Sequence, residues 1–96
     1  MSVVEIVSFR VKAEVDPIQF AQIDAAVGRD YVSRQPGFLS RETAKGDDGW
    51  VVIVHWADTA AADASMASYE QAPAAAEQMS CMEEGSMVMR RFTLVS

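Results

Sequence analysis

The stretch WVVIVHWA at residues 50–57 is the most apolar segment of the chain and decides its fold. In a β-strand, alternate side chains point to opposite faces of the sheet. One face of this strand would carry both tryptophans, and the other would carry Val51, Ile53 and His55. Because a strand that is apolar on both faces has to be covered on both, we expect it in the interior of a sheet, with material packed on each side.

Three further strands are predicted around this segment. Residues 3–12 and 86–95 are rich in β-branched and other apolar types that favour strands. Residues 38–45 form a more polar strand, which the turn Gly46-Asp47-Asp48-Gly49 connects to residues 50–57 as a hairpin. The chain therefore supplies four strands.

A first helix is predicted between the first two strands. Asp16-Pro17 marks its start, because aspartate caps helix N-termini and proline suits the first helical position. It ends before Pro36-Gly37, which cannot continue a helix. We expect Asp24 and Asp30 to lie outside its apolar stripe. That stripe consists of Phe20, Ile23, Val27 and Tyr31.

A second helical region follows the hairpin. Asp58 can cap its start, and Pro73 interrupts it. A further helical segment is expected to run from Pro73 to about Glu84, with Gly85 as its stop. The order of elements is thus β-α-β-β-α-β, the split βαβ pattern of a ferredoxin-like domain.

This order predicts an α+β fold, ferredoxin-like βαββαβ, in one domain that spans residues 1–96. Its four-stranded antiparallel sheet would carry the helices on one face. The other face is apolar too, through either the Trp50–Trp56 set or the Val51–Ile53 set. Since half of the residues are apolar and a small domain hides too little surface to bury them, we expect a homodimer through the sheet face.

Composition argues against several classes of partner. The net charge of −6 disfavours nucleic acid and anionic membranes, both of which require a basic surface. Cys81 is the only cysteine, so a disulfide within the chain and a multi-cysteine zinc site are excluded. No signal peptide, stretch of about 20 apolar residues, phosphate loop or metal-ligand cluster is recognisable. We therefore expect a cytoplasmic protein without metal or cofactor.

A series of short motifs resembles the antibiotic biosynthesis monooxygenase (ABM)-type domain of the dimeric α+β barrel superfamily. The motifs are Pro36-Gly37-Phe38-Leu39, Arg41-Glu42, Gly46-Asp47-Asp48-Gly49-Trp50 and Val54-His55-Trp56, followed by an alanine-rich helix. The resemblance implies a dimeric α+β barrel. It also implies a cofactor-independent monooxygenase that acts on a small planar or aromatic compound of the polyketide type. Such an enzyme removes a proton from an acidic carbon, and the resulting anion reacts directly with oxygen.

Two residues are candidates for the catalytic steps. His55 is the only histidine, and histidine ordinarily titrates near neutral pH, so it is the first candidate for general base. The alternative is a structural histidine at the end of the sheet. Arg41 could stabilise the substrate anion, or it could form an ordinary ion pair. The predicted substrate pocket is lined by Trp56, Tyr69, Met66 and Met79, for which the alternative is core packing.

Other interpretations remain open at this point. The chain could be a non-catalytic small-ligand-binding protein or a structural homodimer. A haem-degrading monooxygenase is a third reading, although no predicted helix contains a histidine that could bind haem iron. Of the adjacent Arg90 and Arg91, one should point inward and need a carboxylate, for which Glu5 is the natural partner.

Overall fold

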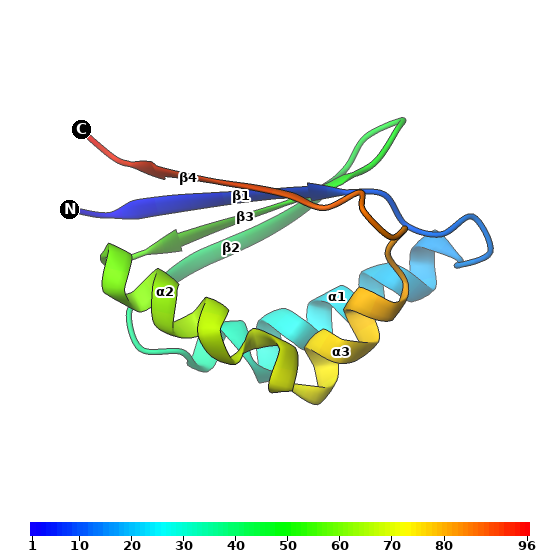
Figure 1. Cartoon of the computed structure of the whole chain (residues 1–96), viewed down its shortest axis with the longest axis horizontal. Coiled ribbons are helices and arrows are strands. Elements are labelled where there is room, and N and C mark those ends of the chain that lie inside the picture. Colours follow the sequence, from blue (N-terminus) through cyan, green and yellow to red (C-terminus); the bar gives the residue numbers. More distant parts are fainter.

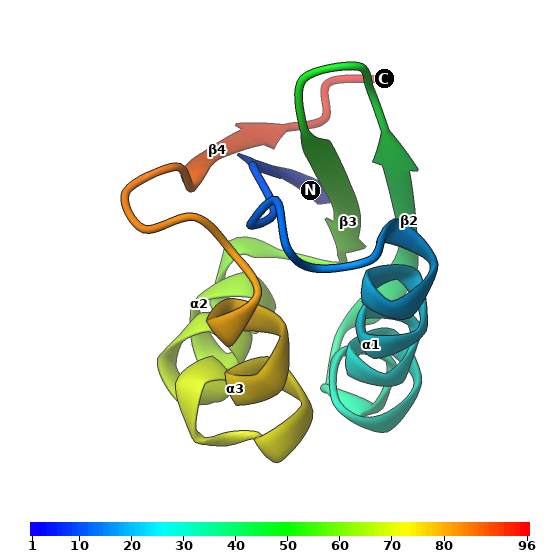
Figure 2. The same cartoon turned by 90° about the vertical axis from the view of Figure 1, so that its right-hand side faces the viewer.

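The computed structural model describes residues 1–96 and has two layers, a sheet and a layer of helices (Figure 1). The strands are β1 (Val3–Phe9), β2 (Phe38–Lys45), β3 (Trp50–Trp56) and β4 (Val88–Thr93). They form an antiparallel sheet in the order β2-β3-β1-β4. The helices α1 (Pro17–Asp30), α2 (Thr59–Ser68) and α3 (Pro73–Ser80) all lie on one side of it (Figure 2). The predicted ferredoxin-like α+β fold is confirmed.

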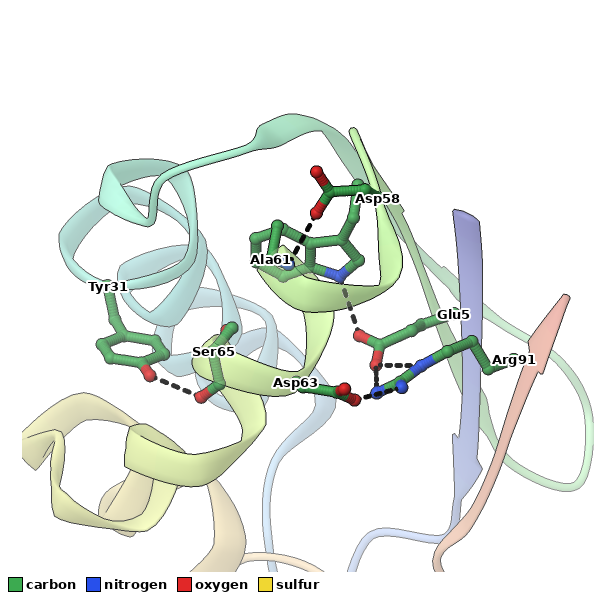
Figure 3. Close-up of polar contacts among 8 residues, drawn as sticks. Glu5, Tyr31, Asp58, Ala61, Asp63, Ser65 and Arg91 are labelled. Carbon is green, nitrogen blue, oxygen red and sulfur yellow. Dashed lines mark hydrogen bonds and ion pairs between the residues drawn. The ribbon is translucent and has the colours of Figure 1, made fainter. Parts of the chain in front are cut away.

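The helix starts follow the predicted capping signals. The Asp16 carboxylate accepts a hydrogen bond from the Gln19 backbone N–H at 3.1 Å. The Asp58 carboxylate accepts a hydrogen bond from the Ala61 backbone N–H at 2.8 Å (Figure 3). Each carboxylate satisfies a backbone donor that the first turn of a helix leaves free, which fixes where the helix begins.

The second helical region differs from the prediction. A 3-10 turn, η2 (Tyr69–Gln71), separates α2 from α3, and α3 ends at Ser80 rather than near Glu84. The reason is tertiary, because the chain beyond Ser80 joins the end of the sheet. The Lys12 N–H donates to the Cys81 carbonyl at 2.8 Å, and the Glu83 N–H donates to the Arg10 carbonyl at 2.8 Å. These bonds draw the chain out of the helix and beside the extension of β1.

The two faces of the sheet have different environments. Trp50 and Trp56 face the helices, and Trp56 is only 1% exposed. Val51, Ile53 and His55 lie on the opposite face, which no helix covers (Figure 1). The structure thus identifies the open face, which the sequence left undecided. No helix is both long and apolar enough to cross a membrane.

Candidate functional site

A cavity of about 140 Å³ lies between the sheet and the helices. Sixteen residues line it, and eleven of them are hydrophobic. Its walls include Val7 and Phe9 of β1 and Val52 and Val54 of β3. An apolar cavity of roughly 150 Å³ can hold benzene, so this cavity has room for about one aromatic ring.

The four residues predicted to form the pocket all line this cavity. Trp56 comes from the end of β3, Met66 from α2, Tyr69 from η2 and Met79 from α3. Met66 is 42% exposed and therefore lies at the mouth, together with Met87 from the loop before β4. Methionine side chains are flexible, so the mouth can widen without a change in the fold.

A buried ion pair forms one polar end of the cavity. Asp24 of α1 is 4% exposed, and its two carboxylate oxygens accept from Arg41 of β2 at 2.7 and 3.2 Å. The Thr43 hydroxyl also donates to this carboxylate, at 2.6 Å. Arg41 lines the cavity, and Asp24 fixes its guanidinium in one orientation. A positive charge is therefore held beside an apolar space.

Gln78 of α3 extends this network to Tyr69. Its amide Nε2 donates to Asp24 Oδ1 at 2.7 Å, and its Oε1 accepts from the Tyr69 hydroxyl. An ionised carboxylate only accepts, so the amide NH₂ must face Asp24 and the amide oxygen must face Tyr69. Tyr69 thus donates its single proton to Gln78. The Tyr69 oxygen retains only lone pairs for any further partner, and such a partner has to be a donor.

Tyr69 is expected to make stability depend on alkaline pH. Burial raises the pKa of Tyr69 from 10.0 to about 12, so the unfolded chain ionises first. The contribution of neutral Tyr69 to the free energy of unfolding is therefore complete below pH 10. It is lost as the pH rises through the pKa of Tyr69 in the folded protein, and the loss amounts to about 3 kcal/mol at most. Denaturant unfolding at several pH values above 9 should show a shallower fall for Tyr69→Phe than for wild type. Identical slopes would contradict the assignment.

A second buried carboxylate forms another polar part of the site. Glu5 of β1 is 5% exposed and accepts from the Trp56 indole N–H at 2.8 Å. Arg91 of β4 donates to its other oxygen at 2.7 and 3.1 Å and bridges to Asp63 of α2 at 2.6 Å (Figure 3). The hydrogen bond with Glu5 raises the pKa of Arg91, which stays cationic. Arg91 is thus the arginine that the prediction paired with Glu5, whereas Arg90 lies on the open face.

His55 does not line this cavity. It is half-buried on the open face of the sheet, where its Nδ1 lies 3.2 Å from the Ser40 hydroxyl oxygen. Arg41 and His55 lie on opposite faces, because Arg41 is in register with Val54, the residue before His55. The structure therefore separates the two predicted catalytic residues, and only Arg41 is placed at the cavity.

The sequence prediction missed Asp24 and Gln78. Asp24 was expected outside the apolar stripe of α1, yet it lies four residues after Phe20 and three before Val27, and all three are buried. This spacing places it on the buried face of the helix, and it was the available signal. No group of histidine, cysteine and carboxylate side chains is arranged to hold a metal ion.

Comparisons with known proteins bear on the fold. No family profile and no curated protein matches the chain. SnoaB, a cofactor-independent oxygenase from Streptomyces nogalater, is 22% identical with a TM-score of 0.80, over 99% of this chain and 94% of SnoaB. A candidate antibiotic biosynthesis monooxygenase from Caulobacter crescentus is 14% identical with a TM-score of 0.80, over 99% and 91%. The chain has the ABM-type fold.

A third structure has a similar fold. It is a dimeric ferredoxin-like protein of unknown function from a Jannaschia species, 11% identical with a TM-score of 0.72, over 98% of this chain and 100% of that one. At these identities the likeness concerns architecture. The ABM-type architecture expected from the sequence motifs is thereby confirmed, and the chemistry has to be argued from the cavity.

Proposed function

We propose that this ABM-fold protein is a cofactor-independent oxygenase of a small aromatic or other planar compound that binds in the cavity. The observation that carries the proposal is an apolar space of about one ring, with the oriented Arg41 guanidinium at its edge. The likeness in fold to SnoaB supports the reaction class. A compound with several fused rings would need the mouth at Met66 and Met87 to widen.

The proposed reaction oxidises an activated CH₂ group beside a ring carbonyl. Loss of a proton gives a carbanion that is delocalised as an enolate or phenolate, and this anion supplies the electrons for reduction of oxygen. The balanced outcome is conversion of CH₂ and O₂ to C=O and water. Asp24 engages only part of the Arg41 guanidinium, which has five N–H donors, so Arg41 can also donate to the anionic oxygen.

The proton acceptor in this proposal is a carboxylate. Glu5 and Glu70 are the two that line the cavity. Glu5 is already bound by Trp56 and Arg91, whereas Glu70 is exposed and forms no ion pair within the chain. Glu70 is therefore the better candidate for general base.

Oxidation of anthrone, followed by the absorbance of the quinone product, tests the proposal. We expect a rate above that of buffer, with one O₂ consumed per product. Glu70→Gln should lower the rate by about 10²-fold or more, because a positioned base contributes at least that much. Glu77→Gln, an exposed change on α3 outside the cavity, is the matched control. A wild-type rate equal to that of buffer would remove the catalytic proposal for this substrate.

The orientation of Tyr69 gives a separate prediction about ligand chemistry. Because its oxygen can only accept a further hydrogen bond, phenol should bind more tightly than anisole, by about tenfold for one hydrogen bond. Gln78→Met frees the Tyr69 proton and should abolish or reverse this preference. Titration calorimetry with the two compounds measures it. Equal affinities for phenol and anisole in wild type would contradict the stated orientation.

A non-catalytic ligand-binding or structural role is the second candidate. It is favoured by the satisfaction of every buried side-chain nitrogen and oxygen within the chain. The cavity is also smaller than the roughly 300 Å³ at which small-molecule sites usually begin. Phenol binding without turnover of any activated CH₂ compound would support this role instead.

The proposal also includes a homodimer through the open face of the sheet. Val88 and Phe92, which lie on either side of Arg90 on this face, are each 50% exposed, and a second copy packed on the face would cover both apolar side chains. The dimeric state of the Jannaschia structure with the same fold supports it. Light scattering should give twice the chain mass, and a monomer at micromolar concentration would contradict it.

A further inference from the structure

The open face of the sheet carries a regular pattern in three rows. Strand register places one residue of each strand in each row, in the order β2, β3, β1, β4. The central row is Glu42, Ile53, Ile6 and Arg90. The two flanking rows are Ser40, His55, Val4 and Phe92, and Ala44, Val51, Ser8 and Val88. The pattern therefore has an apolar centre and two different edges.

The ends of the central row carry opposite charges. Glu42 lies on the β2 edge and Arg90 on the β4 edge, and both are exposed. Neither forms an ion pair within the chain. They cannot pair with each other, because three strand spacings of about 4.8 Å separate their backbones by about 14 Å. Each charge is available to a second molecule.

Charge distinguishes two ways in which this face can meet a copy of itself. A twofold axis parallel to the strands places β2 of one copy over β4 of the other, so Glu42 meets Arg90 twice. An axis across the strands places each edge over the same edge of the other copy. Glu42 would then meet Glu42, and Arg90 would meet Arg90, which is repulsive. The charges favour the axis parallel to the strands.

Side-chain size favours the same axis. In the rows of this face, β2 contributes the small residues Ser40 and Ala44, whereas Phe92 and Val88 of β4 are large and half-exposed. Leu39 of β2 is exposed as well, but it lies in the bulge between Phe38 and Ser40 and belongs to no row. With the axis parallel to the strands, Phe92 lies over Ser40 and Val88 over Ala44. An axis across the strands would oppose Phe92 to Val88 and leave the small residues facing each other, with a gap at one edge.

We propose that two copies pack open face to open face with the twofold axis parallel to the strands, so that Glu42 of each copy pairs with Arg90 of the other. This inference rests on the proposed homodimer and specifies its arrangement. Face-packed sheets lie about 10 Å apart, a gap that the extended glutamate and arginine side chains can span together. Ile53 of one copy then stacks on Ile6 of the other at the centre.

Reversal of single charges tests the arrangement. Glu42→Arg and Arg90→Glu each convert two attractive contacts of the dimer into two repulsive ones. Each should raise the dimer dissociation constant by at least about tenfold, and less at high salt. Sedimentation equilibrium measures this constant. Glu14→Arg and Arg34→Glu, which make the same charge changes at exposed sites outside the sheet, are the controls and should leave it unchanged.

The double variant Glu42→Arg/Arg90→Glu should restore the wild-type dissociation constant, because it regenerates both pairs with reversed sign. An equimolar mixture of the two single variants should likewise form dimers, since each mixed dimer contains two attractive contacts. The arrangement would be overturned if the single charge reversals left the dissociation constant unchanged, or if the double variant dissociated more readily than either single variant. Either result would still be compatible with a homodimer. A wild-type monomer would overturn both the arrangement and the homodimer.

Discussion

Replacement of Asp24 by asparagine is expected to lower the free energy of unfolding by about 3–5 kcal/mol, the usual cost of removing one partner of a buried ion pair. The variant leaves the Arg41 guanidinium, whose side chain is only 10% exposed, without a compensating charge. It also leaves Thr43 and Gln78 to compete for one amide oxygen where the carboxylate offered two. Denaturant unfolding followed by tryptophan fluorescence and by far-UV circular dichroism measures the change.

Asp30→Asn is the matched control, because it is the same substitution on the same helix. The Asp30 side chain is half-exposed, and the hydrogen bond from Arg29 lowers the pKa of its carboxyl. An ion pair in water adds little to stability, so no measurable change is expected. The double variant Asp24→Leu/Arg41→Met should recover part of the lost stability, because it removes both charges together but leaves the Thr43 hydroxyl and the buried Gln78 amide without their acceptor. Equal stability of Asp24→Asn and Asp30→Asn would contradict a structural role for the buried pair.

The Asp24 network also shows which parts of the molecule could be predicted from the sequence. Helix starts and the hairpin depend on neighbouring residues, so the capping signals of Asp16 and Asp58 located them directly. The ion pair and the Gln78 bond join residues 17 and 54 positions apart. No local pattern reports such a contact, because it depends on how α1 packs against α3 and on how Arg41 of β2 reaches α1.

His55 illustrates a second limit of sequence reasoning. The alternation of residues 50–56 correctly separated the tryptophan face from the face with His55. Both faces are apolar, however, so the pattern could not say which one the helices cover. Chemistry was assigned to the only histidine, whereas the structure places the cavity on the other side of the strand.

Gly37→Ala is expected to destabilise the fold by about 3 kcal/mol. Gly37 has a φ of +84°, and a Cβ added there would lie 2.4 Å from the Cβ of Ala61 in α2. Two effects would destabilise the alanine variant. The left-handed backbone conformation costs about 1–2 kcal/mol for a residue with a Cβ, and the clash with α2 costs about 1–3 kcal/mol. Thermal and denaturant unfolding measure the sum.

Gly85→Ala separates these two costs. Gly85 has a similar φ of +78°, but a Cβ there would have no neighbour within 4 Å, so only the backbone cost of about 1–2 kcal/mol is expected. Adding Ala61→Gly to Gly37→Ala should remove the clash with α2. The stability of this double variant should then approach that of Gly85→Ala, but remain about 1 kcal/mol lower because a glycine inside a helix is destabilising. If Gly37→Ala and Gly85→Ala lost the same amount of stability, the close approach between residue 37 and Ala61 would have no energetic effect.

The position of Gly37 connects this stability effect to the cavity. Its carbonyl accepts from the Ala57 N–H at 2.8 Å, which holds the start of β2 against the end of β3 directly before α2 begins. A shift of α2 away from an added methyl group would move Met66, which lines the mouth of the cavity. Gly37→Ala should therefore weaken phenol binding in the folded protein, whereas Gly85→Ala should not. Calorimetry on both variants well below their unfolding temperatures makes the comparison, and unchanged affinity in Gly37→Ala would mean that α2 keeps its place.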